Sequence, residues 1–452
     1  MATSAAERLA ANMNFGMLAK ATDLKKRLLF VLGALIVYRI GTYIPIPGID
    51  PHILAEIYAK QQGGMFGVFN MLAGGAFQRM TIFALAVMPY ISASIIVSIL
   101  TVAMPQLAAL KKEGDAGRRK INQYTRYGTI ALAIFQGYGI SAMLENMTGA
   151  HGSAVMDPGL FFRFTTTVTL TGGTMFLVWL GEQITARGIG NGNSLIIFTG
   201  IIANLPNAVG RTLELGRTGV ISTPFIFLII AIVLGLVAFI VFMERAQRRI
   251  IIQYPKRQVG NKMFGGEATH MPLKLNTSGV IPPIFASSIL LLPVTIAGFS
   301  AGSGGGLFHS VIQGLGTYLA HGQPLYIALY VALIIFFSFF YTSVVFNPAE
   351  TADNLKKNGG FIAGIRPGQQ TAEYLDYVLT RLTAVGALYI ALVCAMPELF
   401  VAKYSVPFQL GGTGLMIVVN VTIDFVTQVQ SHLFAHQYEG LIKKAKLKGK
   451  LK

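Results

Sequence analysis

Two histidines near the end of this 452-residue chain have a spacing that could hold a metal ion. His432 and His436 are four positions apart, so both imidazoles would lie on one face of a helix and could supply two zinc ligands. No third ligand is evident in the sequence, and the dipole of a helix also favours histidine near its C-terminal end. We therefore expect no metal site here.

One acid, Asp424, lies inside an apolar stretch, in the run NVTIDFVTQ at 420–428. Because an ionisable side chain at membrane depth is costly, such a residue is a candidate for proton or ion transfer. Asp424 would be the carrier in a proton-coupled transporter. The alternative is an acid toward the cytosolic third of its span that finds a polar partner. A single acid within ten apolar stretches is weak support for coupled transport, so we favour the alternative.

The motifs of soluble enzymes are missing from the sequence. It contains no GxxxxGK[ST] loop to hold a nucleotide and no HExxH to hold a catalytic zinc. Cys394 is the only cysteine, which excludes an intramolecular disulfide and a CxxC site. We expect a protein that is not an enzyme and uses no cofactor.

The elements that would position these side chains are long apolar stretches, in a chain of which 53% is hydrophobic and 12% charged. A helix needs about 20 mostly apolar residues to cross a bilayer. The strict alternation of a β-barrel is missing, so we expect an all-α polytopic membrane protein with ten transmembrane helices. The stretches lie at about 28–44, 80–104, 128–145, 164–180, 195–205, 223–243, 280–298, 325–346, 384–396 and 409–435.

Lysine and arginine gather in alternate gaps between the ten stretches. The chain start, the even-numbered gaps and the chain end hold 29 of them and the odd-numbered gaps hold 6, with Arg39 inside the first stretch. This positive-inside pattern places both termini in the cytoplasm. The net charge of +17 is then a topology signal beside anionic lipid rather than a sign of nucleic-acid binding. Because residues 2–19 lack an apolar core, we expect the first span to act as an uncleaved signal anchor.

The ten spans divide into two sets of five. Because five is odd, the halves 1–210 and 211–435 would be inverted relative to each other, an arrangement that places the functional site where the halves meet. The cytosolic gaps 244–274 and 347–383 are too long for simple turns, and their mixed composition favours ordered, protruding hairpins. The basic tail 436–452 is cytosolic, and its low-complexity end is expected to be mobile.

Glycine and proline interrupt the apolar pattern in three places. The segment 63–80 is apolar, contains Gly63-Gly64 and Gly74-Gly75, and is too short to span. It is either a re-entrant piece that lines a cavity or an exterior amphipathic loop, and the residues alone leave both open. Pro89 would weaken the backbone hydrogen bonds of the second span, and Pro282-Pro283 mark an interruption or kink near the start of the seventh.

Several motifs that follow one another along essentially the whole chain resemble one membrane-protein family. They are PIPGID at 45–50, MPYISASI at 88–95, KEGDAGRRKINQYTRYGT at 112–129, GEQITARGIGNGNS at 181–194, GVIPPIFASS at 279–288, FNPAETADNLKKNGG at 346–360, GIRPG at 364–368 and TRLTAVGALY at 380–389. The chain resembles the bacterial SecY family, the channel subunits of Sec protein translocases. The resemblance implies a protein-conducting channel of the inner (plasma) membrane with a central pore, driven by its partners.

The resemblance also implies where the pore is sealed. By motif position, the family's ring of aliphatic side chains falls on Val87, Ile91, Asn193, Ile197, Ile284 and Ile417. A narrow apolar ring resists wetting and so excludes ions. Asn193 departs from the aliphatic pattern and should wet the ring unless a neighbour compensates. The segment 63–76 looks like the family's plug, a short re-entrant helix, with candidates Gly64, Met65, Phe66, Phe69, Asn70, Met71, Leu72 and Gly74.

A lateral gate and a docking surface are implied in the same way. The gate opens to lipid between spans two and three on one side and seven and eight on the other, with polar positions Ser92, Gln136 and Asn276. The cytosolic loops match a docking surface for SecA or the ribosome, with candidates Lys256, Arg257 and Arg366, although each could be only a topology determinant.

The resemblance further implies partners for the chain. They are SecE and SecG in the membrane, the SecA motor ATPase, the ribosome, preproteins that bear a signal sequence, and membrane lipid, with SecDF and YidC as further candidates. The channel would conduct unfolded preproteins across the membrane and release transmembrane segments sideways. The alternative function is a proton-coupled transporter of small solutes.

Overall fold

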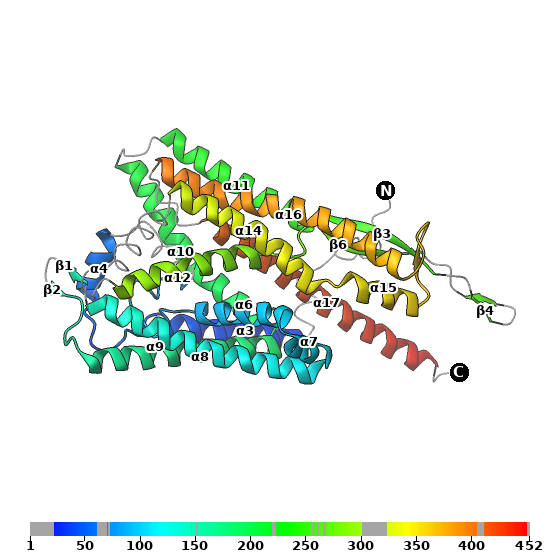
Figure 1. Ribbon diagram of the computed structural model, residues 1–452, viewed down its shortest axis with the longest axis horizontal. Coiled ribbons are helices and arrows are strands. Elements are labelled where there is room, and N and C mark those ends of the chain that lie inside the picture. Colours follow the sequence, from blue (N-terminus) through cyan, green and yellow to red (C-terminus); the bar gives the residue numbers. More distant parts are fainter. Residues whose placement is uncertain are drawn as a thin grey trace.

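The chain folds into a bundle of long helices with a small sheet at one end (Figure 1). The computed structural model describes residues 22–60, 70, 73–145, 147–149, 152–218, 223–254, 257–259, 262–264, 268–300, 323–404 and 411–449. The helices are α3 (Thr22–Gly41), α4 (Pro51–Lys60), α6 (Met88–Ala103), α7 (Pro105–Lys112), α8 (Asp115–Glu145), α9 (Leu160–Arg187), α10 (Gly192–Arg217), α11 (Thr223–Arg245), α12 (Ile281–Ser300), α14 (Pro324–Val345), α15 (Pro348–Lys357), α16 (Gln369–Tyr404) and α17 (Gly412–Gly449). The strands are β1 (Thr148–Gly149), β2 (Gly152–Ser153), β3 (Gln247–Gln253), β4 (Arg257–Val259), β5 (Lys262–Phe264), β6 (Ala268–Lys274) and β7 (Phe361–Ile362).

The long helices form two groups. Figure 1 shows α3, α6, α8 and α9 along one side of the molecule and α11, α14 and α16 along the other. Two helices join the groups, because α10 packs against α3, α9, α11 and α17, and α12 packs against α6, α8, α14 and α16. The first group comes from the first half of the sequence and the second from the second half, whereas the predicted boundary at residue 210 falls inside α10. The inversion of the halves stays a prediction.

The chain is a multispan membrane protein. Each of the ten apolar stretches lies at least partly on a helix. Within the described ranges, six helical segments are long and apolar enough to cross a membrane, or seven if α6 and α7, which meet at a bend of 103°, count as one span. The predicted count of ten is therefore supported only in part. The six segments are Asp115–Glu145, Gly192–Glu214, Pro224–Arg245, Pro324–Lys357, Gln369–Pro397 and Gly412–Phe434.

The second predicted span is helical only in its second part. Residues 73–87 form a buried succession of turns, and α6 begins at Met88. This turn segment fits between α3 and α9 because Gly41 and Gly173 have no Cβ. A Cβ at Gly41 would collide with the ring of Phe83, and a Cβ at Gly173 would collide with the carbonyl of Ile82. A close approach of turns and helices therefore replaces the expected first turns of a span.

The prolines lie where helices begin. Pro89 is in the first turn of α6, where a missing N–H breaks no helical hydrogen bond. The prediction that Pro89 weakens the helix is therefore wrong. Pro282 and Pro283 likewise follow Ile281, the first residue of α12. They mark a helix start rather than a kink within a longer helix.

The two long cytosolic gaps meet in one sheet. β3 pairs antiparallel with β6 from Gln247↔Lys274 to Gln253↔Ala268, which confirms an ordered hairpin at 244–274. The second gap is not a hairpin: it contains α15 and then β7, which pairs with β3 at Ile252↔Ile362. Figure 1 shows β3, β6 and α15 at the same end of the bundle. The two gaps therefore build a single protruding unit.

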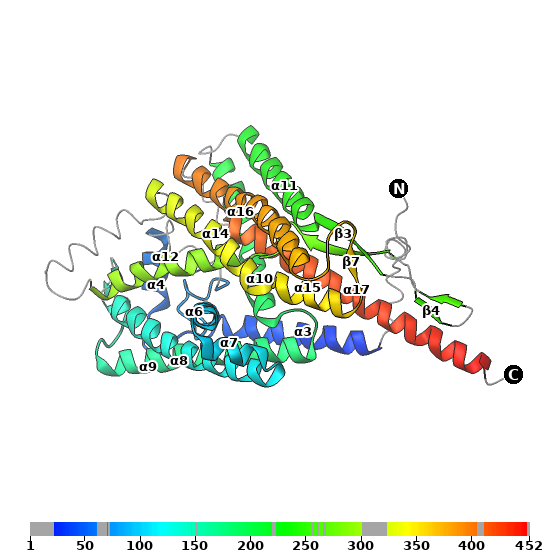
Figure 2. The same cartoon turned by 45° about the vertical axis from the view of Figure 1, so that its right-hand side comes forward.

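The C-terminal helix extends well beyond its predicted span. α17 continues through Gly449, so the described part of the tail, which was expected to be mobile, is helical. Figure 2 shows its last turns beyond the other helices, at the end of the molecule that carries the sheet. The basic tail and the two long gaps therefore share one end of the bundle, as the charge pattern predicts.

Candidate functional site

An apolar cluster at the centre of the bundle brings five of the six predicted ring residues together. Val87, Ile197, Ile284 and Ile417 are buried members of this cluster, and Ile91 packs against it. They come from α6 and the residue before it, α10, α12 and α17. Each of the four buried side chains is at most 9% exposed. Residues far apart in the sequence thus belong to one buried apolar cluster, and their arrangement as a ring stays a prediction.

The starts of the helices position the ring residues. The Ile91 amide donates to the Val87 carbonyl over 3.1 Å, which holds these two residues one turn apart at the start of α6. The Asn191 side chain accepts from the amides of Asn193 and Ser194 and caps α10. Such a cap satisfies amides that have no partner within the helix. All four helices therefore present their ring residue within their first two turns.

Asn193 is a polar residue beside this apolar cluster. Its amide oxygen is buried and accepts no hydrogen bond within the part of the chain that the structure describes. The oxygen lies against Gly181 on α9, so close that a Cβ at Gly181 would collide with it. The Asn193 side chain also interacts with the Tyr90 hydroxyl of α6. Neighbouring helices thus accommodate the amide.

Two of the predicted plug residues, Asn70 and Gly74, are described, and both are anchored. The Asn70 carbonyl accepts from the Asn204 side chain of α10 over 3.3 Å, and its own side-chain oxygen accepts from the Gln78 amide over 2.9 Å. The Gly74 carbonyl accepts from Arg39 of α3 over 3.0 Å. Outside the described residues lie the other six candidates, Gly64, Met65, Phe66, Phe69, Met71 and Leu72.

The three predicted gate residues are buried, but within the described ranges no hydrogen bond joins them. Ser92 and Gln136 are 8% and 7% exposed, and the Gln136 side-chain oxygen has no partner there. Asn276 instead donates to the Glu244 carboxylate of α11 over 2.6 Å and accepts from the Gly279 amide just before α12. The structure therefore does not show the polar contacts that we expected across the gate.

Apolar contacts close the seam between the two helix groups. α12 packs against both α6 and α8, as the two sides of a closed gate would. Ile95 of α6, Phe285 of α12 and Phe337 of α14 form a buried cluster, in which the two phenylalanine rings meet edge to face at 5.7 Å. The seam is thus held mainly by dispersion and by the exclusion of lipid.

Of the predicted docking residues, Arg366 and the backbone of Arg257 are described, and both lie in the segments between α11 and α12 and between α14 and α16. Arg366 is exposed in the turn between β7 and α16, and its carbonyl accepts from the Thr371 hydroxyl over 2.9 Å, which fixes the turn. The backbone of Arg257 lies in β4, and Lys256 lies outside the described residues. Only the position of the Arg366 side chain can therefore be stated.

The other candidates for chemistry find no support. Asp424 and His432 are exposed, and the His436 side chain lies outside the described part. Among the described residues no group of three or more potential metal ligands exists. The buried acid is Glu244 at the end of α11, which the sequence analysis did not single out. An acid at the end of an apolar run beside Arg245 gives no signal by which it could have been found.

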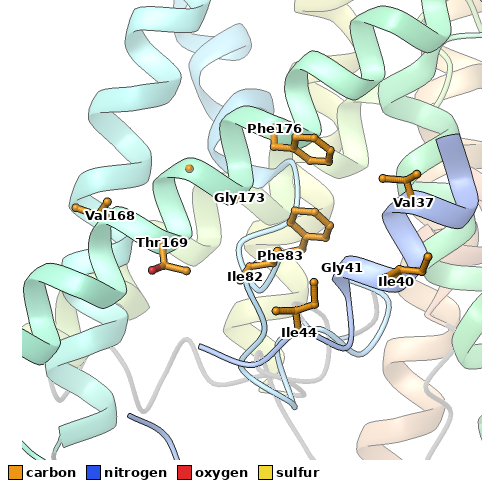
Figure 3. A pocket seen from close by; sticks show the side chains of 11 residues that line it. Val37, Ile40, Gly41, Ile44, Ile82, Phe83, Val168, Thr169, Gly173 and Phe176 are labelled. Carbon is orange, nitrogen blue, oxygen red and sulfur yellow. The ribbon is translucent and has the colours of Figure 1, made fainter. Parts of the chain in front are cut away.

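An apolar groove lies between α3 and α9. It has a volume of about 470 Å³ and an almost wholly apolar lining. Figure 3 shows Val37 and Ile40 of α3 and Val168 of α9 around it, with the rings of Phe83 and Phe176 between them. These two rings stack at 5.8 Å.

A family model described as SecY matches residues 81–426. The chain belongs to the SecY family. It is 56% identical over 429 residues to the protein translocase subunit SecY of Rickettsia typhi, covering 95% of this chain and 98% of that protein. The identity to the same subunit of Escherichia coli K12 is also 56%, over 427 residues, covering 94% and 96%.

Solved structures share the SecY fold at low sequence identity. A structure described as a protein conducting channel superposes with a TM-score of 0.62 at 17% identity, covering 90% of this chain and 92% of that chain. Sec61 from a canine ribosome-channel complex superposes with a TM-score of 0.56 at 15% identity, with the same coverage. The fold is therefore that of the SecY and Sec61 channels.

Proposed function

We propose that this chain is the central pore-forming subunit of a Sec translocon in the bacterial inner (plasma) membrane. It conducts unfolded preproteins across the membrane and releases transmembrane segments sideways into lipid. The observation that carries the proposal is the convergence of five aliphatic residues from four helices in one cluster: Val87, Ile91, Ile197, Ile284 and Ile417.

The chemistry of this cluster suits a seal that must also let a chain pass. A narrow apolar constriction offers water no hydrogen-bond partner, so it dewets and blocks ions. It offers a translocating chain no charge or donor that would hold it. A solved SecY structure of the same fold is described as having a plug domain that stabilises the closed channel and maintains the membrane seal. The segment 63–76, anchored here through Asn70 and Gly74, takes that role in our proposal.

The lateral gate lies between α6 and α8 on one side and α12 and α14 on the other. The contact of Ile95 with Phe285 and Phe337 supports this assignment, because an apolar signal sequence can replace one apolar surface with another. Such an exchange has a small net cost. Ser92 and Gln136 stay buried while the gate is closed and become available to a polar neighbour when it opens.

The chain itself is not an enzyme in this proposal, and partners supply the energy. Arg366, with Lys256 and Arg257, docks the SecA ATPase or the ribosome at the sheet unit, which places that unit and both termini in the cytoplasm. One related structure is Sec61 in a ribosome-channel complex, and another is a yeast Ssh1 complex bound to the ribosome. SecDF and YidC would be further partners.

The membrane partners SecE and SecG each need an apolar surface. The groove between α3 and α9 supports one such contact. Its rim residues Ile40 and Val168 are 61% and 55% exposed, so a partner helix would bury apolar area that this chain leaves open.

Reconstitution tests the proposed function. The chain is placed with SecE in vesicles, SecA and ATP are added, and protection of a preprotein from external protease is measured. We expect protection that depends on ATP. A proton-coupled transporter would instead take up solute and lose that uptake in Asp424→Asn, whereas the exposed position of Asp424 predicts translocation that this variant leaves unchanged. No protected preprotein, together with uptake that Asp424→Asn abolishes, would overturn the proposal.

A further inference from the structure

A second pocket lies beside the predicted plug segment, between the C-terminal end of α3, the turn at 75–79 and the second half of α10, and its lining includes Arg39 and Asn204, which anchor that segment. It has a volume of about 480 Å³. Its described lining includes Arg39 and Arg79, the Tyr43 hydroxyl and the amides of Gln78, Asn204 and Asn207, and none of these described residues is an acid. We propose that this pocket binds a phosphate group, as carried by the headgroup of an anionic phospholipid or by inorganic phosphate.

The structure holds the two arginines close together. Arg39 and Arg79 both donate to the Gly74 carbonyl, over 3.0 Å and 3.4 Å, so the two donor nitrogens cannot be farther apart than the sum of these distances. Both guanidinium groups also lie over the Tyr43 ring, at 5.1 Å and 4.0 Å from its centre. Two like charges at such a separation repel each other.

No acid offsets this repulsion within the described ranges. Arg126 is paired with Glu182 and Arg163 with Glu145, but neither arginine of the pocket has a carboxylate within ion-pair distance there. Arg39 is also the one basic residue inside the ten apolar stretches. A half-buried pair of cations without a counter-charge favours the binding of an anion.

A phosphate group can accept hydrogen bonds from the N–H donors of Arg39 and Arg79 that the described residues do not use. A guanidinium group has five N–H donors. The hydrogen bonds to described residues use three on Arg39 and two on Arg79, which leaves donors on both. Two non-bridging oxygens of one phosphate can accept from two guanidinium groups at once, and the planar fork of arginine suits this geometry. The pocket volume is within the usual range of ligand sites, about 300–1,000 Å³.

The position of the pocket suits a lipid headgroup. Arg39 lies in the last turn of α3, at the end opposite to its basic start, so the charge pattern predicts the outer side of the membrane. Both arginines are half-buried. Inorganic phosphate could reach the same donors from the outer aqueous phase, and the two sources are separated by experiment.

Native mass spectrometry of the detergent-purified chain in its SecE complex tests the lipid source. Equal amounts of phosphatidylglycerol and phosphatidylcholine are added, and the ratio of the two bound lipids is measured. We expect a preference for phosphatidylglycerol that falls by about tenfold in Arg39→Gln/Arg79→Gln, which corresponds to about 1.4 kcal/mol. The matched control is Arg187→Gln/Arg217→Gln, which removes the same charge from exposed positions and should keep the ratio.

Inorganic phosphate is the second probe. Broadening of its ³¹P signal by the complex in phosphatidylcholine nanodiscs is compared between the parent chain and the same two double variants. Broadening that only the pocket variant loses, without lipid preference, supports the site with free phosphate as its source. Because the pocket variant could fold poorly, both measurements are repeated with Arg79→Lys, which keeps the charge but loses the fork and should weaken binding. The proposal would be overturned if the parent chain and all pocket variants bound both probes equally. It would also be overturned if none of these proteins bound either probe.

Discussion

The amide oxygen of Asn193 lies directly against Gly181 on the neighbouring helix and accepts no hydrogen bond within the described part of the chain. An unpartnered buried acceptor costs about 1–3 kcal/mol. Asn193 is thus the polar exception among the predicted ring residues, whose other members, such as Ile197 and Ile417, are aliphatic. Two predictions concern this pair.

Asn193→Leu should lower the resting ion conductance of the channel. Leucine branches at Cγ as asparagine does but has no polar atom to hold water at the predicted ring. Single-channel recording in planar bilayers measures the effect, and Asn122→Leu, an exposed site at the start of α8, is the control. Unchanged conductance in Asn193→Leu would mean that Asn193 is not part of the ring or that the plug alone sets the seal.

Gly181→Ala should destabilise the protein by about 1–3 kcal/mol, because the added methyl group needs the space of the Asn193 amide. Asn193→Ala in the same chain should restore much of that stability, since the smaller side chain frees the space. Thermal unfolding of both variants in detergent gives the coupling between the two positions. Effects that simply add would show that the residues do not touch.

Asn276→Leu should destabilise the packing of α11 against the segment just before α12. It removes the donor of the 2.6 Å hydrogen bond to Glu244 and leaves a buried carboxylate without its partner. The expected loss in unfolding free energy is about 1–3 kcal/mol. Asn276→Leu/Glu244→Leu should recover part of it, because the buried carboxylate is then absent, while the Gly279 amide and the Ser278 hydroxyl still lose their acceptor. A double variant less stable than the single one would contradict this explanation.

Arg366→Glu should lower the affinity for SecA or the ribosome by at least about tenfold, because a charge-assisted contact is worth about 1.5–3 kcal/mol. The variant should still insert and fold, since the Arg366 side chain is exposed. Binding to vesicles that contain the complex is measured, with Arg217→Glu at the other end of the bundle as the control. Normal binding and translocation by Arg366→Glu would remove this residue from the docking surface.

The sequence predicts much of the fold, because apolar length and charge alternation depend only on local composition. The positions of the helices follow from these patterns, as does the protruding hairpin of β3 and β6. The pairing of Ile252 with Ile362 joins residues far apart in the sequence, and no local pattern contains it. The predicted ring positions came from motif resemblance, and the structure adds that five of them share one buried apolar cluster.

The misses have a common cause in tertiary contacts. The turns at 73–87 look like the start of a span, but the space left by Gly41 and Gly173 lets them pack without a helix. Asn276 was assigned to the gate by motif position, and the structure adds that its side chain donates to Glu244 of α11. Asp424 was a candidate proton carrier because it lies within an apolar stretch, and its side chain is exposed. Periodicity cannot show which neighbour a polar side chain meets.

Cross-linking at the ring tests the central claim, that the polypeptide passes through the constriction, most directly. In a Cys394→Ala background, Ile197→Cys is placed in the ring and Ile202→Cys, 40% exposed on the same helix, serves as the control. A preprotein with one cysteine is arrested during translocation and oxidised. We predict a disulfide with Ile197→Cys and none with Ile202→Cys. Cross-links to Ile202→Cys alone, or to neither position while translocation proceeds, would contradict the account.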